Sequence, residues 1–168
     1  AAIAANEPRF VAGKFGQAVL VEEGTTNLVT NPDDGTLTGE IPGCSGKYHS
    51  FSTGYGVKDW NVPSVAATGK SFTYSIWMRS TTSPASTALL YVYDGTGPDG
   101  GWWSFGGFNL TSEWKRYMYP RSDMTGTISK IRVYRSNEQG TLDIACPQLE
   151  AKPYATSFVD GTRAHEAL

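Results

Sequence analysis

Hydrophobic and polar residues alternate along much of this chain with a period of two, which is the period of a β-strand with one buried face. Clusters of Gly, Pro, Asn, Asp and Ser separate the alternating runs, and no long run shows the period of a helix. The pattern predicts strands at residues 17–22, 71–79, 88–93, 114–119, 128–135 and 141–146. Weaker runs at residues 47–52, 102–108 and 154–159 are further strand candidates.

Short strands separated by turn residues are typical of an all-β sandwich or barrel. A chain of 168 residues suits one such domain, which we expect at residues 25–163. Residues 30–46 are mostly polar and contain several prolines and glycines, so they are expected to form a loop. The first 24 residues precede the regular spacing of strands and are expected to form an N-terminal arm or an edge strand, and residues 164–168 a tail.

Alternation also assigns side chains to faces, because successive residues of a strand point to opposite sides of its sheet. The residues expected to point into the core include Phe72, Tyr74, Ile76, Met78, Leu142, Ile144 and Cys146. The residues expected on the opposite face include Trp77, Arg79, Tyr91, Tyr93, Arg132 and Tyr134. A face rich in rings and guanidinium groups is either covered by another part of the chain or used for binding. The N-terminal arm or the segment around residues 102–103 would be the cover.

Two adjacent tryptophans lie in the glycine-rich segment 97–108, which reads GPDGGWWSFGGF. Successive side chains of an extended segment point in opposite directions. We therefore expect one of Trp102 and Trp103 to anchor the segment while the other is displayed, and the sequence leaves open which does which. Trp60, in a segment expected to be a loop, is a further candidate for a displayed ring.

The composition narrows the class of partner. Charged residues make up 18% and aromatic residues 12% of the chain, and the net charge is −2. Nucleic acid is not an expected partner, because binding to phosphates needs a clustered basic surface. A membrane is not an expected partner either, because no apolar run approaches the roughly 20 residues of a membrane-spanning helix.

The sequence gives little support for a catalytic activity. The chain has two histidines, His49 and His165, and neither lies in the sequence pattern of an activated nucleophile. A glycosidase would need two carboxylates at a fixed separation, and none stands out as a pair among Asp94, Asp99, Glu113, Asp123 and Asp143. We therefore expect a protein that is not an enzyme, with a small glycoside hydrolase or lyase as the less favoured alternative.

Two pairs of residues, one of cysteines and one of aspartates, each allow two interpretations. Cys44 and Cys146 either form one disulfide or stay free thiols, and the free thiols are preferred, with Cys146 as a small buried residue of a strand. Asp94 and Asp99 either help to hold a calcium ion or only form turns, and turns are preferred.

Aromatic rings beside polar groups suit a saccharide. A pyranose has a face of C–H groups that packs on an indole or phenol ring, and a rim of hydroxyls that Arg, Asp, Asn and Gln can bind. Such a site needs no acid or base. The candidate ligand-binding residues are Trp102, Trp103, Trp77, Arg79, Tyr91, Tyr93, Trp60 and Arg132.

Several segments carry a family resemblance over roughly residues 24–163. The sequences FTYSIWMRS (72–80), EWKRY (113–117) and TLDIACPQLE (141–150) follow one another in the order and spacing of carbohydrate-binding modules of the family 4/9/22 type, which this chain resembles. The flanks EEGTTNLVTNP (22–32) and QLEAKPYATSFVDGTRA (148–164) resemble modules of phage tail and minor structural proteins and of large secreted multimodular proteins.

The resemblance implies a jelly-roll β-sandwich of two antiparallel sheets, of the galactose-binding-like kind, with no catalytic activity. It implies a plant-type or cell-surface polysaccharide as the ligand, bound on an aromatic-lined sheet face or cleft. It also implies an extracellular or virion-associated location and linkage to other domains of a larger protein. The alternative function is a structural or assembly module of a phage tail or similar particle, whose aromatic face makes protein contacts.

The resemblance further implies a structural calcium ion held partly by an acidic residue of the last strand. This chain departs from the usual Ile-Asp-Asn/Asp pattern, since it has Ile144, Ala145 and Cys146 there. Asp143 is the remaining candidate on that strand. We therefore expect that no cofactor is required, and we assign no calcium ligands.

Overall fold

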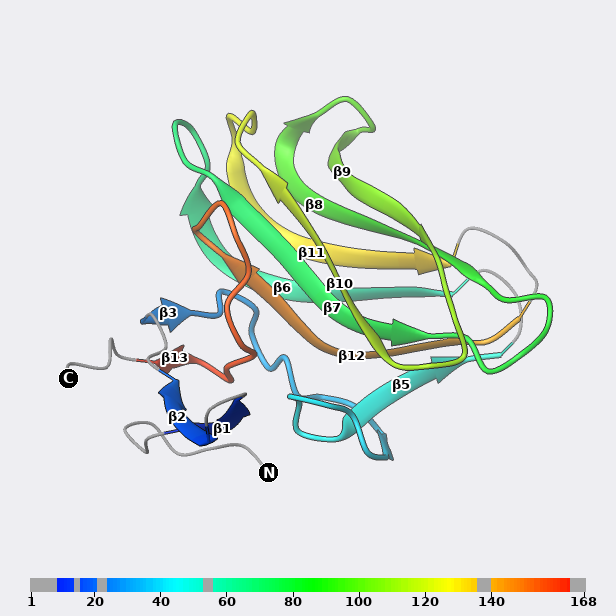
Figure 1. Ribbon diagram of the computed structural model, residues 1–168. Helices are drawn as coiled ribbons and strands as arrows, with labels where there is room; N and C mark the ends of the chain where they lie inside the picture. Colours follow the sequence, from blue (N-terminus) through cyan, green and yellow to red (C-terminus); the bar gives the residue numbers. More distant parts are fainter. Residues whose placement is uncertain (1–8, 14–15, 21–23, 53–55, 136–139, 164–168) are drawn as a thin grey trace.

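The computed structural model describes residues 9–13, 16–20, 24–52, 56–135 and 140–163. Its body is a sandwich of two sheets, which confirms the predicted all-β fold class (Figure 1). The first sheet, called here the β7 sheet, has the strand order β10-β7-β12-β5-β4. The second, called the β8 sheet, has the order β6-β11-β8-β9. Within the described residues no helix is long and apolar enough to cross a membrane.

The strands agree well with the alternating runs. The β7 sheet consists of β4 (Leu37–Thr38), β5 (Lys47–Phe51), β7 (Phe72–Arg79), β10 (Lys115–Arg121) and β12 (Leu142–Glu150). The β8 sheet consists of β6 (Val57–Ala66), β8 (Thr87–Gly97), β9 (Gly101–Asn109) and β11 (Thr127–Arg135). Residues 154–159 form no strand, which corrects one of the weaker strand predictions.

The core lies between these two sheets and is built from the residues that alternation points inward. Phe72, Tyr74, Ile76 and Met78 of β7 are fully buried, as predicted, and pack with the inward residues of β8, β11 and β12. Cys146 is the exception. It has a φ of 50° and lies where the register of β12 with β7 shifts, so its side chain joins a second apolar cluster outside the core.

Strand β6 contains Pro63 and was not predicted from the sequence. A proline lacks a backbone N–H, so it is tolerated mainly at sheet edges and bulges. Both conditions are met here. β6 is an edge strand of the β8 sheet, and its register with β11 shifts between Ile128 and Lys130.

The second apolar cluster covers the outer face of the β7 sheet. It contains Ile41, Ala145 and Cys146, and the partly buried residues packed against it are Cys44, Tyr48, Trp77, Trp114 and Phe158. Cys44 and Cys146 form a disulfide with a Cα–Cα distance of 6.1 Å. The preference for free thiols was therefore wrong, because the bulge in β12 turns Cys146 outward to meet the loop that carries Cys44.

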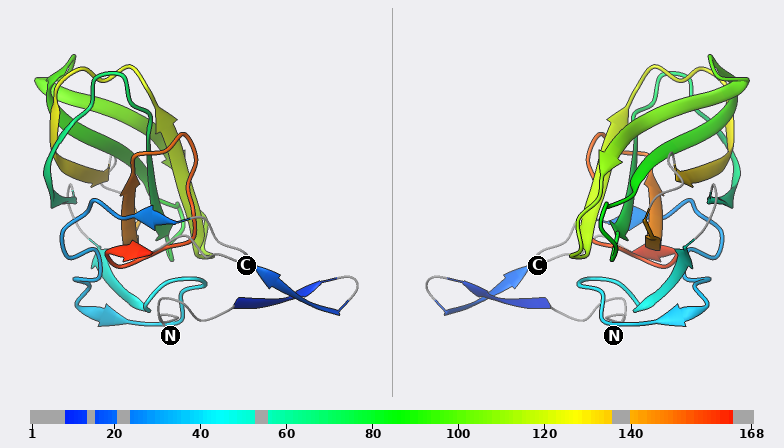
Figure 2. Two further views of the ribbon diagram at one scale, coloured as in Figure 1. Left: turned by 90° about the vertical axis from the view of Figure 1, so that its left-hand side faces the viewer. Right: turned by 90° about the vertical axis from the view of Figure 1, so that its right-hand side faces the viewer.

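Two small sheets lie outside the sandwich. Strands β3 (Thr25–Thr26) and β13 (Thr162–Arg163) pair, so the two flanks of the domain meet. Strands β1 (Arg9–Gly13) and β2 (Gly16–Leu20) form a hairpin that projects away from the sandwich (Figure 2). This hairpin does not lie across the outer face of the β8 sheet. Residues 164–168, the expected tail, are outside the described residues.

Candidate functional site

The predicted site residues separate onto two different faces. Trp77 and Arg79 lie on β7, whereas Tyr91, Tyr93 and Arg132 lie on β8 and β11 in the other sheet. All of them point away from the core, as alternation predicted. The single face that was expected to combine them does not exist, because alternation tells whether a side chain points outward but not to which sheet its strand belongs.

The outer face of the β7 sheet is an internal contact surface. Trp77 packs in the second apolar cluster, beneath the loop that carries Cys44. The Arg79 guanidinium lies 4.6 Å from the centre of the Trp114 ring, and its Nε donates a hydrogen bond of 2.9 Å to Asp143. This face is therefore covered, but by the loop that carries Cys44 and not by the N-terminal arm or the segment around residues 102–103 that was expected to cover it. Trp77 and Arg79 stabilise the cover.

The outer face of the β8 sheet presents the aromatic groups. It contains a shallow depression of about 250 Å³. The residues that line it are Tyr91, Asp99, Trp102, Arg132 and Tyr134. Asp99 comes from the turn between β8 and β9, which forms one rim of the depression. The sequence suggested Asp99 as a turn residue or a calcium ligand, but not as part of the binding face.

Trp102 is held between a cation and a second ring. The Arg132 guanidinium carbon lies 4.2 Å from the centre of the Trp102 ring. Tyr93 meets the same ring edge-on, with 5.1 Å between ring centres and an angle of 62° between planes. Arg132 also donates two hydrogen bonds to Asp59, from Nε at 2.7 Å and from Nη2 at 2.8 Å. The hydrogen bond to Asp59 raises the pKa of Arg132, although burial alone would lower it.

Tyr91 keeps its hydroxyl proton more tightly than an ordinary tyrosine. Burial raises its pKa, and the negative charge of Asp99 and the nearby Tyr134 raise it further. The phenol is therefore neutral at physiological pH, so its hydroxyl can both donate and accept hydrogen bonds beside the Asp99 carboxylate, which only accepts them.

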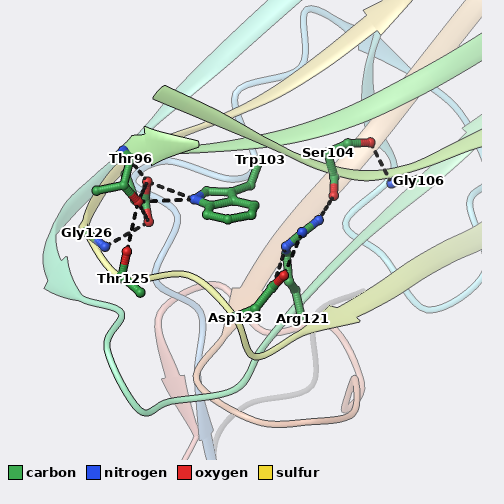
Figure 3. A network of polar contacts seen from close by, with 9 residues as sticks. Thr96, Trp103, Ser104, Gly106, Arg121, Asp123, Thr125 and Gly126 are labelled. Carbon is green, nitrogen blue, oxygen red and sulfur yellow. Dashed lines mark hydrogen bonds and ion pairs between the residues drawn. The ribbon is translucent and has the colours of Figure 1, made fainter. Parts of the chain in front are cut away.

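Trp103 anchors the segment that displays Trp102. Its indole packs against the main core, and its Nε1 donates a 3.0 Å hydrogen bond to Asp94 (Figure 3). The Arg121 guanidinium lies 4.4 Å from the centre of its ring. Arg121 is in turn held by Asp123 and by the carbonyl oxygen of Ser104. Of the two adjacent tryptophans, Trp103 is therefore the anchor and Trp102 is the displayed ring. Trp103 supports the site but does not line the depression.

Asp94 accepts the hydrogen bonds that fix this corner, from Thr96, Trp103 and Gly126, which Figure 3 labels. The carboxylate accepts hydrogen bonds from the backbone N–H groups of Thr96 at 2.7 Å and Gly126 at 2.9 Å, as well as from Trp103. Burial raises the pKa of Asp94, but these donors outweigh it and the pKa is lowered overall. The geometry is that of a turn-forming aspartate, as preferred from the sequence.

Acid is expected to remove the stabilising contribution of Asp94. Its pKa is lower in the folded chain than its ordinary value of 3.8, so this contribution is complete above that pH and is lost as the pH falls through the lower native pKa. Urea unfolding between about pH 6 and pH 2 would measure the loss. Asp94→Asn does not titrate and should show a weaker pH dependence; equal slopes for both proteins would contradict this role.

Trp60 is not a displayed ring. It belongs to β6, is 4% exposed, and packs in the main core. Its Nε1 donates to Asp34, which also accepts hydrogen bonds from His49 and Lys58. Burial raises the pKa of Asp34, but these donors lower it overall. The prediction that Trp60 is a displayed ring was wrong, because its segment is a strand that points Trp60 into the core.

A calcium ion does not fit Asp143. The Asp143 carboxylate is paired with Arg79 and is almost fully buried. In the part of the chain that the structure describes, no three His, Cys, Asp or Glu side chains gather in a way that could hold a metal ion. The calcium suggested by the family resemblance therefore stays a prediction without assigned ligands.

Comparisons with known proteins support the fold. No protein family's sequence profile matches the chain, and no curated protein matches it. Among solved structures, the chain is similar to a family 29 carbohydrate-binding module from Piromyces equi, with 14% identity, a TM-score of 0.50, and coverage of 79% of this chain and 89% of that one. It also aligns with a family 16 carbohydrate-binding module (9% identity, TM-score 0.46, coverage 73% and 85%). A third is the CBM22-1 xylan-binding domain of Paenibacillus barcinonensis Xyn10C (10% identity, TM-score 0.43, coverage 85% and 100%). At 14% identity, the likeness to the Piromyces equi module shows the β-sandwich fold alone.

Proposed function

We propose that this protein is a non-catalytic carbohydrate-binding module that binds an oligosaccharide or polysaccharide on the outer face of the β8 sheet. The observation that carries the proposal is the aromatic depression lined by Tyr91, Trp102 and Tyr134, which no described segment of the chain covers. The equivalent face of the β7 sheet is sealed by a disulfide-linked loop, so the two faces differ in use.

The chemistry of the depression suits a sugar ring. Trp102 is half-buried, and the part of its ring that Arg132 and Tyr93 leave exposed is an apolar surface against which C–H groups can pack. Tyr91 and Asp99 place a hydroxyl and a carboxylate at the rim, where sugar hydroxyls need donors and acceptors. At about 250 Å³ the depression is smaller than the roughly 300–1,000 Å³ pockets that enclose drug-sized ligands. It therefore suits contact with a short segment of a longer chain.

An oxidising location is part of the proposal. Disulfides persist mainly in secreted and surface-exposed proteins, and the Cys44–Cys146 disulfide supports an extracellular setting. We further propose that the domain is linked to others in a larger protein. The competing hypothesis is that the aromatic face contacts other proteins in a phage particle, and the test below distinguishes the two.

Trp102→Ala is expected to weaken glycan binding by at least about tenfold, because the indole that forms one wall of the depression is lost. Affinity gel electrophoresis with β-glucan, xylan and mannan would measure retardation. Tyr154→Ala is the control, since Tyr154 is 48% exposed but lies outside the depression.

Retardation of the wild type and of Tyr154→Ala but not of Trp102→Ala would support the proposal. The proposal would be abandoned if no glycan retarded the wild type, and self-association in light scattering would then favour protein contacts. Release of reducing sugar from any of these polysaccharides would show that the protein is an enzyme.

A further inference from the structure

Four side chains form a continuous stack across the outer face of the β8 sheet, with one from each strand. Asp59 on β6 is the register partner of Arg132 on β11, and Trp102 on β9 is the register partner of Tyr93 on β8. These two pairs are joined by the contact of 4.2 Å between the Arg132 guanidinium carbon and the centre of the Trp102 ring. We call these residues the cross-strand stack.

The Arg132–Trp102 contact spans a whole strand. In the order β6-β11-β8-β9, strand β8 separates β11 from β9. Trp102 therefore leans from the edge strand across β8 toward β11, and does not stand upright at the sheet edge. This orientation makes its ring a wall of the depression beside Tyr91.

Both ends of the stack are themselves fixed. Asp59 holds one edge of the guanidinium through two hydrogen bonds of 2.7 and 2.8 Å, so the plane of Arg132 has a set orientation. At the other end, the Tyr93 ring lies against the backbone of Gly101. A Cβ there would lie 2.6 Å from Cε2 of Tyr93, and the φ of 94° also favours glycine. The indole is thus confined from two sides.

We infer that Asp59 and Arg132 are positioning residues that hold the Trp102 ring across β8 in the orientation that binds the ligand. The role in binding rests on the proposed function, whereas the effect on the ring does not. Asp59 is the more informative member, because it does not line the depression. Its effect on binding must therefore act through Arg132 and Trp102.

The test uses the whole protein with its five tryptophans labelled as 5-fluorotryptophan, and ¹⁹F NMR without ligand. Trp102→Phe identifies the Trp102 resonance. Asp59→Ala is expected to shift this resonance, and to weaken glycan binding about three- to tenfold, as the loss of an oriented cation–π contact would. Asp59→Asn, which keeps the shape of the side chain but not its charge, is a second variant. Asn61→Ala is the control, since Asn61 is an exposed residue on the same strand and the same face.

The outcomes separate this inference from the proposed function. A shifted Trp102 resonance together with weaker binding in Asp59→Ala, and neither change in Asn61→Ala, would support positioning. An unshifted resonance in both Asp59 variants, or a shift that leaves affinity unchanged, would overturn it. If the wild type bound no glycan, the proposed function and the binding role would both fail, and the resonance would still show whether Asp59 holds the ring.

Discussion

Replacing Cys44 and Cys146 together by alanine is expected to lower the free energy of unfolding by about 4 kcal/mol. The disulfide joins residues 102 positions apart, and closing so long a loop removes much of the conformational entropy of the unfolded chain. It also holds the loop that carries Cys44 over Trp77 on the outer face of the β7 sheet. Loss of the bond should therefore have two effects. The unfolded chain gains conformational entropy, and in the native state the loop packs less firmly over Trp77.

Urea unfolding of the double variant and of the wild type, each with and without reductant, would measure the effect. Reductant should destabilise the wild type and leave the double variant unchanged. The free energies of unfolding of the wild type and the double variant should be compared without reductant. A difference of less than about 1 kcal/mol would contradict the expected stabilisation, and would show that the bond strains the native state or that the unfolded chain is already compact.

The alternation of the sequence was sufficient to predict most strands and the inward side chains. Tyr74 and Ile76 are fully buried as expected, because period two is imposed by the pleat whatever the partner strand. Assignment to a sheet depends on which strands pair over long distances, and a local pattern does not contain that information. This is why Trp77 and Tyr91 were grouped together although the core separates them.

The stack partner of Arg132 was missed for a related reason. Asp59 lies in β6, a strand whose residues around Trp60 were expected to form a loop. Without that strand, the pairing of Asp59 with Arg132 could not be foreseen, and Trp60 was taken for an exposed ring. Pro63 in this segment does not argue against a strand, because a proline is tolerated at a bulged sheet edge.

The two flanks that carried part of the family resemblance prove to be bonded to each other. The backbone N–H of Asn27, in the first flank, donates to the carbonyl oxygen of Gly161, in the second. Thr25 donates to Glu150, which also accepts a hydrogen bond from Thr156. Thr25, Asn27 and Glu150 are buried, so these polar residues join two chain segments that are far apart in the sequence.

Asn27→Ala is expected to lower the free energy of unfolding by about 3 to 5 kcal/mol, because it would leave four buried or partly buried backbone groups without partners. Asn27 is 5% exposed. Its Nδ2 donates to the carbonyl oxygens of Pro147 at 3.0 Å and Val159 at 3.1 Å. Its Oδ1 accepts from the backbone N–H groups of Val29 and Leu149, both at 3.1 Å. One side-chain amide thus supplies hydrogen-bond partners to backbone groups at the bulge in β12 and in both flanks.

Chemical unfolding of Asn27→Ala beside Asn61→Ala would test this joint, since Asn61 is exposed and its loss should cost less than about 0.5 kcal/mol. Asn27→Asp separates the two halves of the amide. A carboxylate still accepts from Val29 and Leu149 but repels the carbonyl oxygens of Pro147 and Val159, so it should also destabilise the fold. If Asn27→Ala unfolded within about 1 kcal/mol of the wild type, water would have replaced the side chain, and the joint between the flanks would depend on β3 and β13 instead.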